Sequence, residues 1–216
     1  MRLPATFAAL VLTQAALAST PEPTPGPVPA GNYTLDKAHT SLIFRVNHLG
    51  FSFFTARFTH IDADLKADPA RFAASQLNVT IDPKSITSDN APEGFLAMLS
   101  CKDWLEADKF PQMTFRSTRV EITAPNKLRV RGDLTLHGVT KPIVLDAKYN
   151  GGYAGHPMDP HARIGFSATA RFKRSDFGVS AGIPAPGTTM GVGDEVEVVL
   201  ETELTGPPLA GAVAPN

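Results

Sequence analysis

The sequence contains one cysteine, Cys101, so no disulfide can form within the chain. It also lacks an excess of either charge, since 20 basic and 21 acidic residues give a net charge of −1. This balance argues against nucleic acid as a partner and gives no support for a polybasic membrane-binding surface. After the N-terminal segment, no apolar run approaches the ~18 residues that a membrane-spanning helix needs. A chain without disulfides must rely on its hydrophobic core for stability.

The N-terminal segment has the three features of a secretory signal peptide, in the expected order. Arg2 supplies a positive charge, residues 3–12 are mostly apolar, and Ala16-Leu17-Ala18 is an A-x-A cleavage signal. We therefore expect residues 1–18 to be a cleaved signal peptide and the protein to be exported to the periplasm. An N-terminal amphipathic helix is the alternative.

Proline occupies every second position from Pro21 to Pro29, which predicts an extended, semi-rigid tether over residues 19–30. The folded domain is expected to span residues 31–204. Residues 205–216, which include Gly206-Pro207-Pro208, are predicted to form a flexible tail. The mature chain of ~198 residues suits a single domain with a sizeable core.

Most of this domain alternates apolar and polar residues, which is typical of β-strands with one buried face. The clearest case is the last strand, where Val196, Val198 and Leu200 alternate with polar or outward positions. One-sided strands of this kind favour antiparallel pairing. The apolar parity switches between Phe58 and Ile61, which predicts a bulge or a change of packing environment. The predicted strands contain residues 42–46, 54–65, 77–81, 113–115, 128–136, 143–149, 164–172 and 196–204.

The stretch from Leu134 to Ile143 predicts a strand, a tight corner and a second strand within ten residues. Gly138 can adopt the positive φ that a corner often needs. Pro142 has no amide hydrogen to donate, which suits the start of the second strand and not its centre. The corner therefore predicts an antiparallel hairpin.

One region departs from the strand pattern. Residues 92–105 carry apolar side chains at helical spacing, with Pro92 in a first turn and Asp89-Asn90 as caps. Together these observations predict an all-β fold, an eight-stranded antiparallel barrel with a short helical insertion at about 92–105. Closure into a barrel removes exposed sheet edges. A two-sheet sandwich is the alternative, since alternation alone does not prove closure.

Several separate segments carry a family resemblance. They are Asp36-Lys37-Ala38-His39-Thr40-Ser41-Leu42-Ile43-Phe44 with Asn47-His48-Leu49-Gly50, Asp103-Trp104-Leu105 with Phe110-Pro111-Gln112-Met113-Thr114-Phe115, Leu134 to Ile143, Phe172-Lys173-Arg174-Ser175-Asp176-Phe177-Gly178, and Val192-Gly193-Asp194-Glu195-Val196. In this order they resemble the YceI-like proteins, also called polyisoprenoid-binding or base-induced periplasmic proteins. The resemblance implies a lipocalin-like barrel whose elongated apolar cavity holds an isoprenoid chain or a related long-chain lipid. It also implies a homodimer.

The helical segment departs from the family pattern. Many members carry a charged Arg-Asp pair and a His-Leu pair there, whereas this chain reads Pro92-Glu93-Gly94-Phe95-Leu96-Ala97-Met98-Leu99. Met98 stands where the histidine would be. If that histidine holds a polar ligand head in other members, this protein must hold the head differently.

A carrier of a long apolar chain needs a cavity with few polar groups, because unpaired polar groups lose free energy when desolvated. The 13 phenylalanines and five methionines of the chain suit such a lining. A core completely filled by these side chains is the alternative. The candidate ligand-binding residues are Phe44, Phe58, Phe95, Met98, Leu99, Trp104, Phe115, Phe166, Phe172 and Val198.

The six histidines form neither an H-E-x-x-H helix nor a close pair on one strand face. A fold could still bring His39, His48 and His137 together near one end of the barrel. We predict no metal site, no catalytic residue and no cofactor other than a bound isoprenoid or long-chain lipid.

Two loops are candidates for the rim of the barrel. The glycine- and proline-rich loop at residues 182–193 can form a mobile edge over the mouth. Phe51-Ser52-Phe53-Phe54 clusters aromatic side chains at a turn, where they can face the ligand, a membrane or a second subunit.

The leading functional hypothesis is an exported protein that binds a polyisoprenoid, quinone-like or long-chain lipid for transport, storage or stress protection. Its partners would be that lipid, a second copy of the chain in a homodimer, and a membrane in transient contact. The alternatives are an enzyme that uses histidines as acid and base at the barrel mouth, and a structural or stress-response protein with a filled core.

Overall fold

The computed structural model describes residues 28–156 and 158–209. The predicted signal peptide, residues 1–18, and most of the predicted tether lie outside these ranges. Within them, no helix has both the length and the apolar character needed to cross a membrane.

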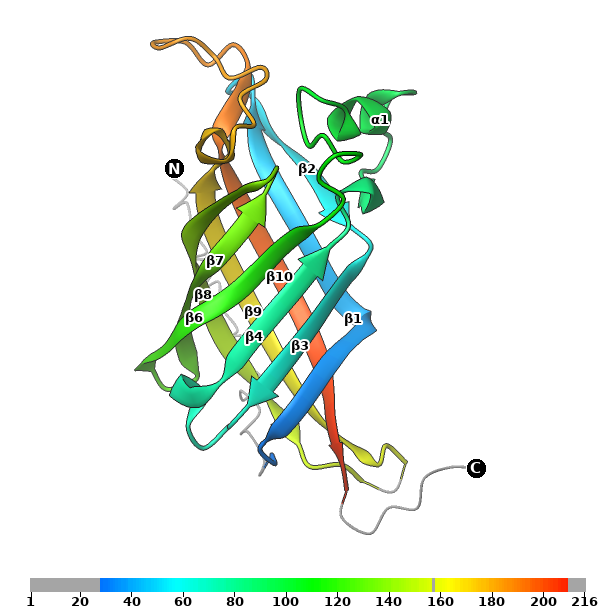
Figure 1. The fold of residues 1–216 in the computed structure, drawn as a ribbon, viewed down its shortest axis with the longest axis vertical. Helices are drawn as coiled ribbons and strands as arrows, with labels where there is room; N and C mark the ends of the chain where they lie inside the picture. The colour runs from blue at the N-terminus through cyan, green and yellow to red at the C-terminus, as the bar shows by residue number, and fades with distance from the viewer. Residues whose placement is uncertain (1–27, 157, 210–216) are drawn as a thin grey trace, which may run out of the picture.

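The described chain is mostly β-strand, with one short α-helix and three short 3-10 segments (Figure 1). The strands are β1 (Gly31–His48), β2 (Ser52–Phe58), β3 (Ile61–Ala67), β4 (Gln76–Ile81), β5 (Ile86–Thr87), β6 (Met113–Ala124), β7 (Lys127–Leu136), β8 (Val139–Tyr153), β9 (His161–Lys173) and β10 (Val192–Pro208). Helix α1 spans Phe95–Ser100, and the 3-10 segments are η1 (Phe72–Ala74), η2 (Pro83–Ser85) and η3 (Arg174–Phe177).

Eight of these strands close into an antiparallel barrel, which confirms the predicted fold class (Figure 1). The order around the ring is β10-β9-β8-β7-β6-β4-β3-β1, and β1 pairs again with β10. Strand β2 pairs with the second half of β1, and β5 pairs with β2. Because the ring closes on itself, it is not the two-sheet sandwich that the strand pattern left open.

The change of parity after Phe58 coincides with the break between β2 and β3. Strand β2 pairs with the second half of β1, whereas β3 pairs with the first residues of β1 and with β4. At the break, the Thr59 amide donates to the Ser85 carbonyl at 3.1 Å, and the Asp82 amide donates to the His60 carbonyl at 3.0 Å. The parity switch therefore marks the passage from β2 to β3, which pack in different environments, and this is the second of the two predicted alternatives.

The segment from Leu134 to Ile143 forms the β7–β8 hairpin. Leu136 pairs with Val139, so His137 and Gly138 are the two turn residues, with φ values of 52° and 74°. A two-residue turn with both φ values positive matches the twist of the strands it joins. Glycine is required at position 138, since a Cβ there would lie 2.3 Å from the Phe110 ring.

The helical insertion is present but shorter than predicted. Helix α1 has six residues, and Gly94 is its N-cap, with no side chain capping it. The predicted start at Pro92 and the predicted caps at Asp89 and Asn90 are therefore wrong. The Phe95 amide donates to the Pro92 carbonyl at 3.1 Å, so Pro92 belongs to the turn before the helix.

The last strand runs a few residues past the predicted end of the domain at residue 204. Strand β10 continues to Pro208, and Thr205 pairs with both Thr34 and Arg163. The sequence Gly206-Pro207-Pro208 suggests a flexible tail, but position 206 requires glycine because the chain packs closely there. A Cβ at this position would come within 2.1 Å of the buried Tyr33 ring. Residues 205–208 are therefore part of the barrel, and residues 210–216 of the predicted tail lie outside the described chain.

Candidate functional site

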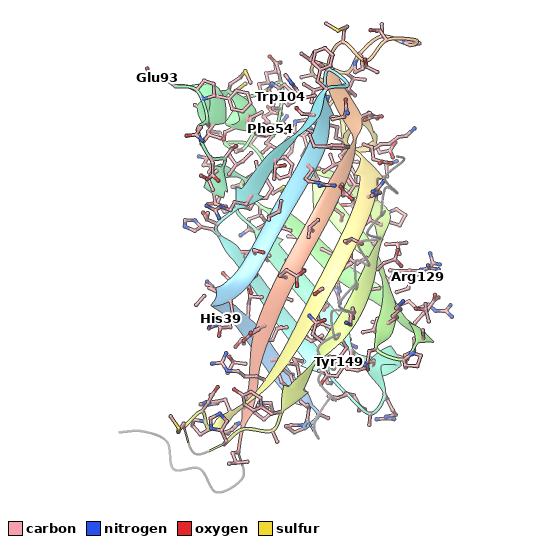
Figure 2. All side chains as sticks on the ribbon, turned by 180° about the vertical axis from the view of Figure 1, so that it is seen from behind. His39, Phe54, Glu93, Trp104, Arg129 and Tyr149 are labelled. Carbon is pink, nitrogen blue, oxygen red and sulfur yellow. The ribbon has the colours of Figure 1, made fainter. Side chains whose placement is uncertain are left out.

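One end of the barrel is closed by a cluster of aromatic side chains. The Phe72 ring lies 5.0 Å from the Tyr149 ring and 6.2 Å from the Phe166 ring, centroid to centroid. Tyr33 is completely buried in the same cluster and donates its hydroxyl to the Pro29 carbonyl at 2.7 Å. Figure 2 shows Tyr149 near this end, with Phe54 and Trp104 near the other.

An apolar cavity of about 460 Å³ lies in the barrel interior beyond this cluster. It lies within the range of 300–1,000 Å³ that is typical of small-molecule sites. Strands of the ring and helix α1 both contribute to its wall, and none of the closed-end aromatic residues does. The barrel core is therefore not completely filled by its own side chains.

Three aromatic contacts connect the barrel wall to the helical insertion. The Phe44 and Phe58 rings stack at 5.4 Å, and the Phe44 and Phe54 rings meet edge to face at 6.4 Å. The Phe54 ring in turn meets the Phe95 ring of α1 edge to face at 5.4 Å. This chain of contacts holds α1, three of whose residues line the cavity, at the end of the barrel away from the closed end (Figure 1). We call this end the open end.

The structure places nine of the ten predicted ligand-binding residues on the cavity wall. They are Phe44, Phe58, Phe95, Met98, Leu99, Trp104, Phe115, Phe172 and Val198. The tenth, Phe166, is not among the cavity-lining residues, because its ring packs against Tyr149 at 5.4 Å in the closed end. The inward stripe of β9 runs from the cavity into this cluster, so periodicity assigns the face of Phe166 correctly but not its depth.

Further wall residues come from the same apolar stripes and were left out of the predicted set. They include Leu42, Val79, Ile81, Leu134, Leu136, Ile143 and Leu145. The alternation of apolar and polar residues in these strands was the feature of the sequence that could have identified them. His48 and Ser52 also line the cavity, at the β1–β2 turn, and no apolar pattern points to them.

Arg174 is the one charged side chain among the cavity-lining residues described. It is almost completely buried, and its guanidinium lies 5.3 Å above the Trp104 ring. Burial lowers the pKa of Arg174 from its usual value. The guanidinium donates to the carbonyls of Gly193, Val179 and Val192 at 2.9 to 3.0 Å. Arg174 thus ties the 3-10 segment η3 to the start of β10 beside the cavity.

The histidines that the sequence left open do not form a common site. His39 and His48 are nine residues apart on β1, at roughly 3.3 Å of rise per residue. His137 packs against Phe110, with ring centroids 4.9 Å apart, and its Nε2 lies 3.4 Å from a Glu106 carboxylate oxygen. That contact is within ion-pair distance but lacks hydrogen-bond geometry. His137 therefore packs the corner of the hairpin.

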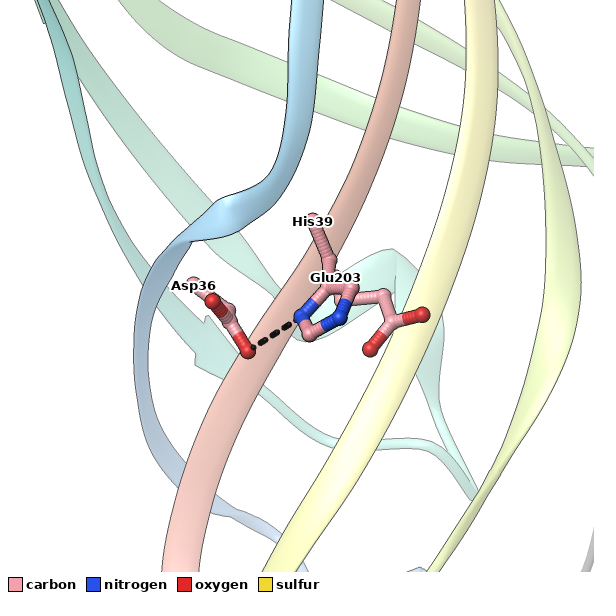
Figure 3. Close-up of side chains that lie close together, drawn as sticks. All are labelled: Asp36, His39 and Glu203. Carbon is pink, nitrogen blue, oxygen red and sulfur yellow. Dashed lines mark hydrogen bonds and ion pairs between the residues drawn. The ribbon is translucent and has the colours of Figure 1, made fainter.

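His39 lies instead on the outer wall with Asp36 and Glu203, where three ligand atoms come within 4.8 Å of one another (Figure 3). His39 Nδ1 is 3.0 Å from Asp36 Oδ2, and Arg163 pairs with both carboxylates. Hydrogen bonds from His39 and then Arg163 lower the pKa of Asp36 to about 2. The guanidinium already neutralises these oxygens, so the cluster is an ion-pair network and a poor cation site.

Comparison with known proteins gives a match over most of the chain. A family model described as the YceI-like domain matches residues 33–204. A UPF0312 protein of Vibrio cholerae is 38% identical over 176 residues, covering 81% of this chain and 87% of that protein. A UPF0312 protein of Vibrio vulnificus is 40% identical over 171 residues, covering 78% of this chain and 86% of that protein.

Solved structures share the same fold. BcnA of Burkholderia cenocepacia superimposes with a TM-score of 0.67 at 25% identity, covering 78% of this chain and 98% of BcnA. A YceI protein of Campylobacter jejuni gives a TM-score of 0.62 at 34% identity, covering 81% of this chain and 98% of that protein. A domain of Saccharophagus degradans described as polyisoprenoid-binding gives a TM-score of 0.60, covering 81% of this chain and 98% of that domain. Because its sequence is only 17% identical, this similarity shows a common fold and no more.

Proposed function

Because this chain belongs to the YceI-like family, we propose that it holds one long-chain lipid in its barrel cavity. The candidate ligands are a polyisoprenoid, a quinone-like molecule or another long-chain amphiphile. The observation that carries the proposal is the cavity of about 460 Å³, walled by apolar side chains and stopped at one end by aromatic residues. A solved relative of the same fold is described as polyisoprenoid-binding, which agrees with this ligand class.

The affinity can come from burial of hydrocarbon alone. Removing ~400 Å² of ligand surface from water contributes about 10 kcal/mol at ~25 cal/mol per Å². Immobilising the ligand costs a large part of this free energy, which leaves binding in the micromolar range or tighter. Selectivity would then depend on chain length and cavity shape, since Arg174 already donates to three carbonyls.

Trp104 allows a direct test, because it is the only tryptophan of the chain and lines the cavity. After removal of bound lipid, titration with a C20 or longer isoprenoid alcohol should change the fluorescence of Trp104 and saturate at one ligand per chain. A short alcohol of the same head group should bind much more weakly.

Two neighbouring residues of β10 provide a matched pair of variants. Val198 lines the cavity, whereas Val199 is not among its lining residues. We expect Val198→Phe to reduce ligand affinity about tenfold or more because the added ring occupies cavity volume. Val199→Phe makes the same change outside the cavity and should bind as the original protein does. Equal affinities of the two variants would contradict the proposed site.

We further propose that the protein acts in the periplasm, for transport, storage or protection of the lipid. This rests on the signal-peptide features of residues 1–18. A homodimer is proposed on the family resemblance alone. Catalysis is not part of the proposal. A catalytic role could be tested by replacing the histidines His39, His48 and His137.

A further inference from the structure

Large apolar side chains are exposed at the open end of the barrel. Within the described ranges six such side chains are exposed, and four of them are Phe51, Phe53, Met98 and Met190. They come from the β1–β2 turn and the start of β2, from helix α1 and from the loop before β10, which project at the same end (Figure 1). Exposed apolar groups that gather in this way usually mark an interaction surface.

The two loops that carry three of these residues contain no charge. No Asp, Glu, Lys or Arg occurs at residues 46–56 or 177–193, which are flanked by Arg45, Arg57, Asp176 and Asp194. The loops touch, because the Leu49 amide donates to the Gly191 carbonyl at 2.8 Å. They form one neutral surface, which we call the apolar rim and define as residues 48–53 and 188–191.

The other two exposed side chains lie in a different setting. Ile122 is next to Glu121, which is paired with Arg119, and Met158 is next to Asp159, which is paired with Arg163. These charges would have to be desolvated if that end contacted hydrocarbon. At the apolar rim one charge lies close by, because the Arg45 guanidinium is 5.1 Å from the centre of the Phe53 ring and pairs with Glu197. Phe51 and Met190, in contrast, have only uncharged residues beside them in the sequence.

The apolar rim is continuous with the cavity. His48 and Ser52 belong to the rim and also line the cavity, and the exposed Met98 of α1 lines it as well. A long-chain ligand that leaves through this opening into water would expose its methylene groups one after another, which is unfavourable. If the opening rests on hydrocarbon, the chain stays in an apolar environment throughout.

We propose that the apolar rim docks on the surface of a lipid bilayer, with Phe51, Phe53 and Met190 inserted at the interface, and that the ligand passes there between bilayer and cavity. Aromatic and large apolar side chains are the groups that anchor proteins at this depth. Since residues 48–53 and 188–191 contain no Lys or Arg, and the nearby Arg45 is paired with Glu197, docking should depend on apolar contact and not on anionic lipid. This inference rests on the proposed function for its purpose, but it is tested separately.

The test is co-sedimentation of the mature chain with vesicles made only of phosphatidylcholine and phosphatidylethanolamine. The original protein should bind, and raising the salt concentration should not release it. The double variant Phe51→Ser/Met190→Ser should bind about tenfold or more weakly. Ile122→Ser/Met158→Ser is the matched control, because its side chains are 59% and 92% exposed against 80% and 65% at the rim. It should bind within about twofold of the original.

Ligand binding is measured on the same variants with the Trp104 titration, which keeps the two proposals apart. The rim variant should bind isoprenoid alcohol normally but exchange it with vesicles more slowly. Val198→Phe should lose the ligand and keep vesicle binding. The inference is wrong if the original protein ignores neutral vesicles, if salt or anionic lipid controls binding, or if the rim variant only prevents self-association. That last result would make the rim an interface between copies of the chain.

Discussion

The two ends of this barrel are built from different chemistry. At the closed end, Tyr33 and Tyr149 are buried together, and Asp36, Arg163 and Asp159 form ion pairs on the wall outside. At the open end, the loops are neutral and phenylalanine and methionine side chains face outward. The comparison agrees with the proposed division of roles, in which the closed end supplies stability and the open end would admit and hold a ligand.

The largest effect is expected from truncating the closed end. Tyr33 is completely buried, so Tyr33→Ala should reduce the free energy of unfolding by about 4 kcal/mol through lost burial and a new cavity. Phe53→Ala, an aromatic truncation at the exposed rim, should cost less than about 1 kcal/mol. Denaturant unfolding measures both. Similar losses for the two variants would remove the distinction between the ends.

Arg174 should be the exception at the open end. Arg174→Met leaves three carbonyls without their donor in a nearly buried setting, which should cost about 3 kcal/mol of unfolding free energy. It should also weaken ligand binding, because η3 and the start of β10 form part of the cavity wall. Lys173→Met, at the adjacent exposed position, is the control and should change neither quantity. A stable Arg174→Met variant would show that the carbonyls find other donors.

The ion pairs of the closed end predict a dependence on acid pH. The pKa of Asp36 is lowered to about 2 in the folded protein by hydrogen bonds from His39 and Arg163. A carboxylate with a lowered pKa stabilises the fold above its unfolded pKa of ~3.9 and loses that contribution as pH falls towards 2. We expect about 1 kcal/mol from this residue after allowance for solvent screening. Asp36→Asn should flatten the stability curve between pH 4 and 2, and the exposed Asp133→Asn should not.

The smallest effect should come from His39 at neutral pH. Its hydrogen bond and charge interaction with Asp36 raise the pKa of His39 above 6.5. A raised pKa gives stability that is complete below the unfolded value and is lost as pH rises through the folded value. Thermal unfolding at pH 6 and pH 8 should show a slight fall, and His39→Gln should abolish it. An unchanged fall in that variant would assign the effect to another group.

Much of the fold could be predicted because alternation reports which face of a strand is buried. The change of parity between Phe58 and Ile61 and the two strands of the hairpin at His137-Gly138 follow from it, whereas closure of the ring is seen only in the pairing of β1 with β10. Depth along the barrel leaves no such mark, which is why Phe166 was placed in the cavity and lies in the aromatic cluster that closes it. The full length of the last strand could not be predicted, because glycine at position 206 is typical of a flexible tail. Only the structure shows that Gly206 packs directly against the Tyr33 ring.

The site could be predicted in outline for the same reason. Nine of the candidates line the cavity because they belong to inward stripes, but whether those stripes enclose empty space depends on the packing of the whole barrel. Arg174 could not be assigned from its motif, since the three carbonyls it binds come from residues 179, 192 and 193. These carbonyl groups lie close to the Arg174 side chain only in the folded protein.

Native mass spectrometry of the purified protein would show whether the cavity holds one lipid per chain. We expect a single added mass in the range of a long-chain lipid, which organic solvent removes and which Val198→Phe lacks while Val199→Phe retains it. A protein that purifies with no added mass and takes up no isoprenoid alcohol when reloaded has no lipid site in its barrel.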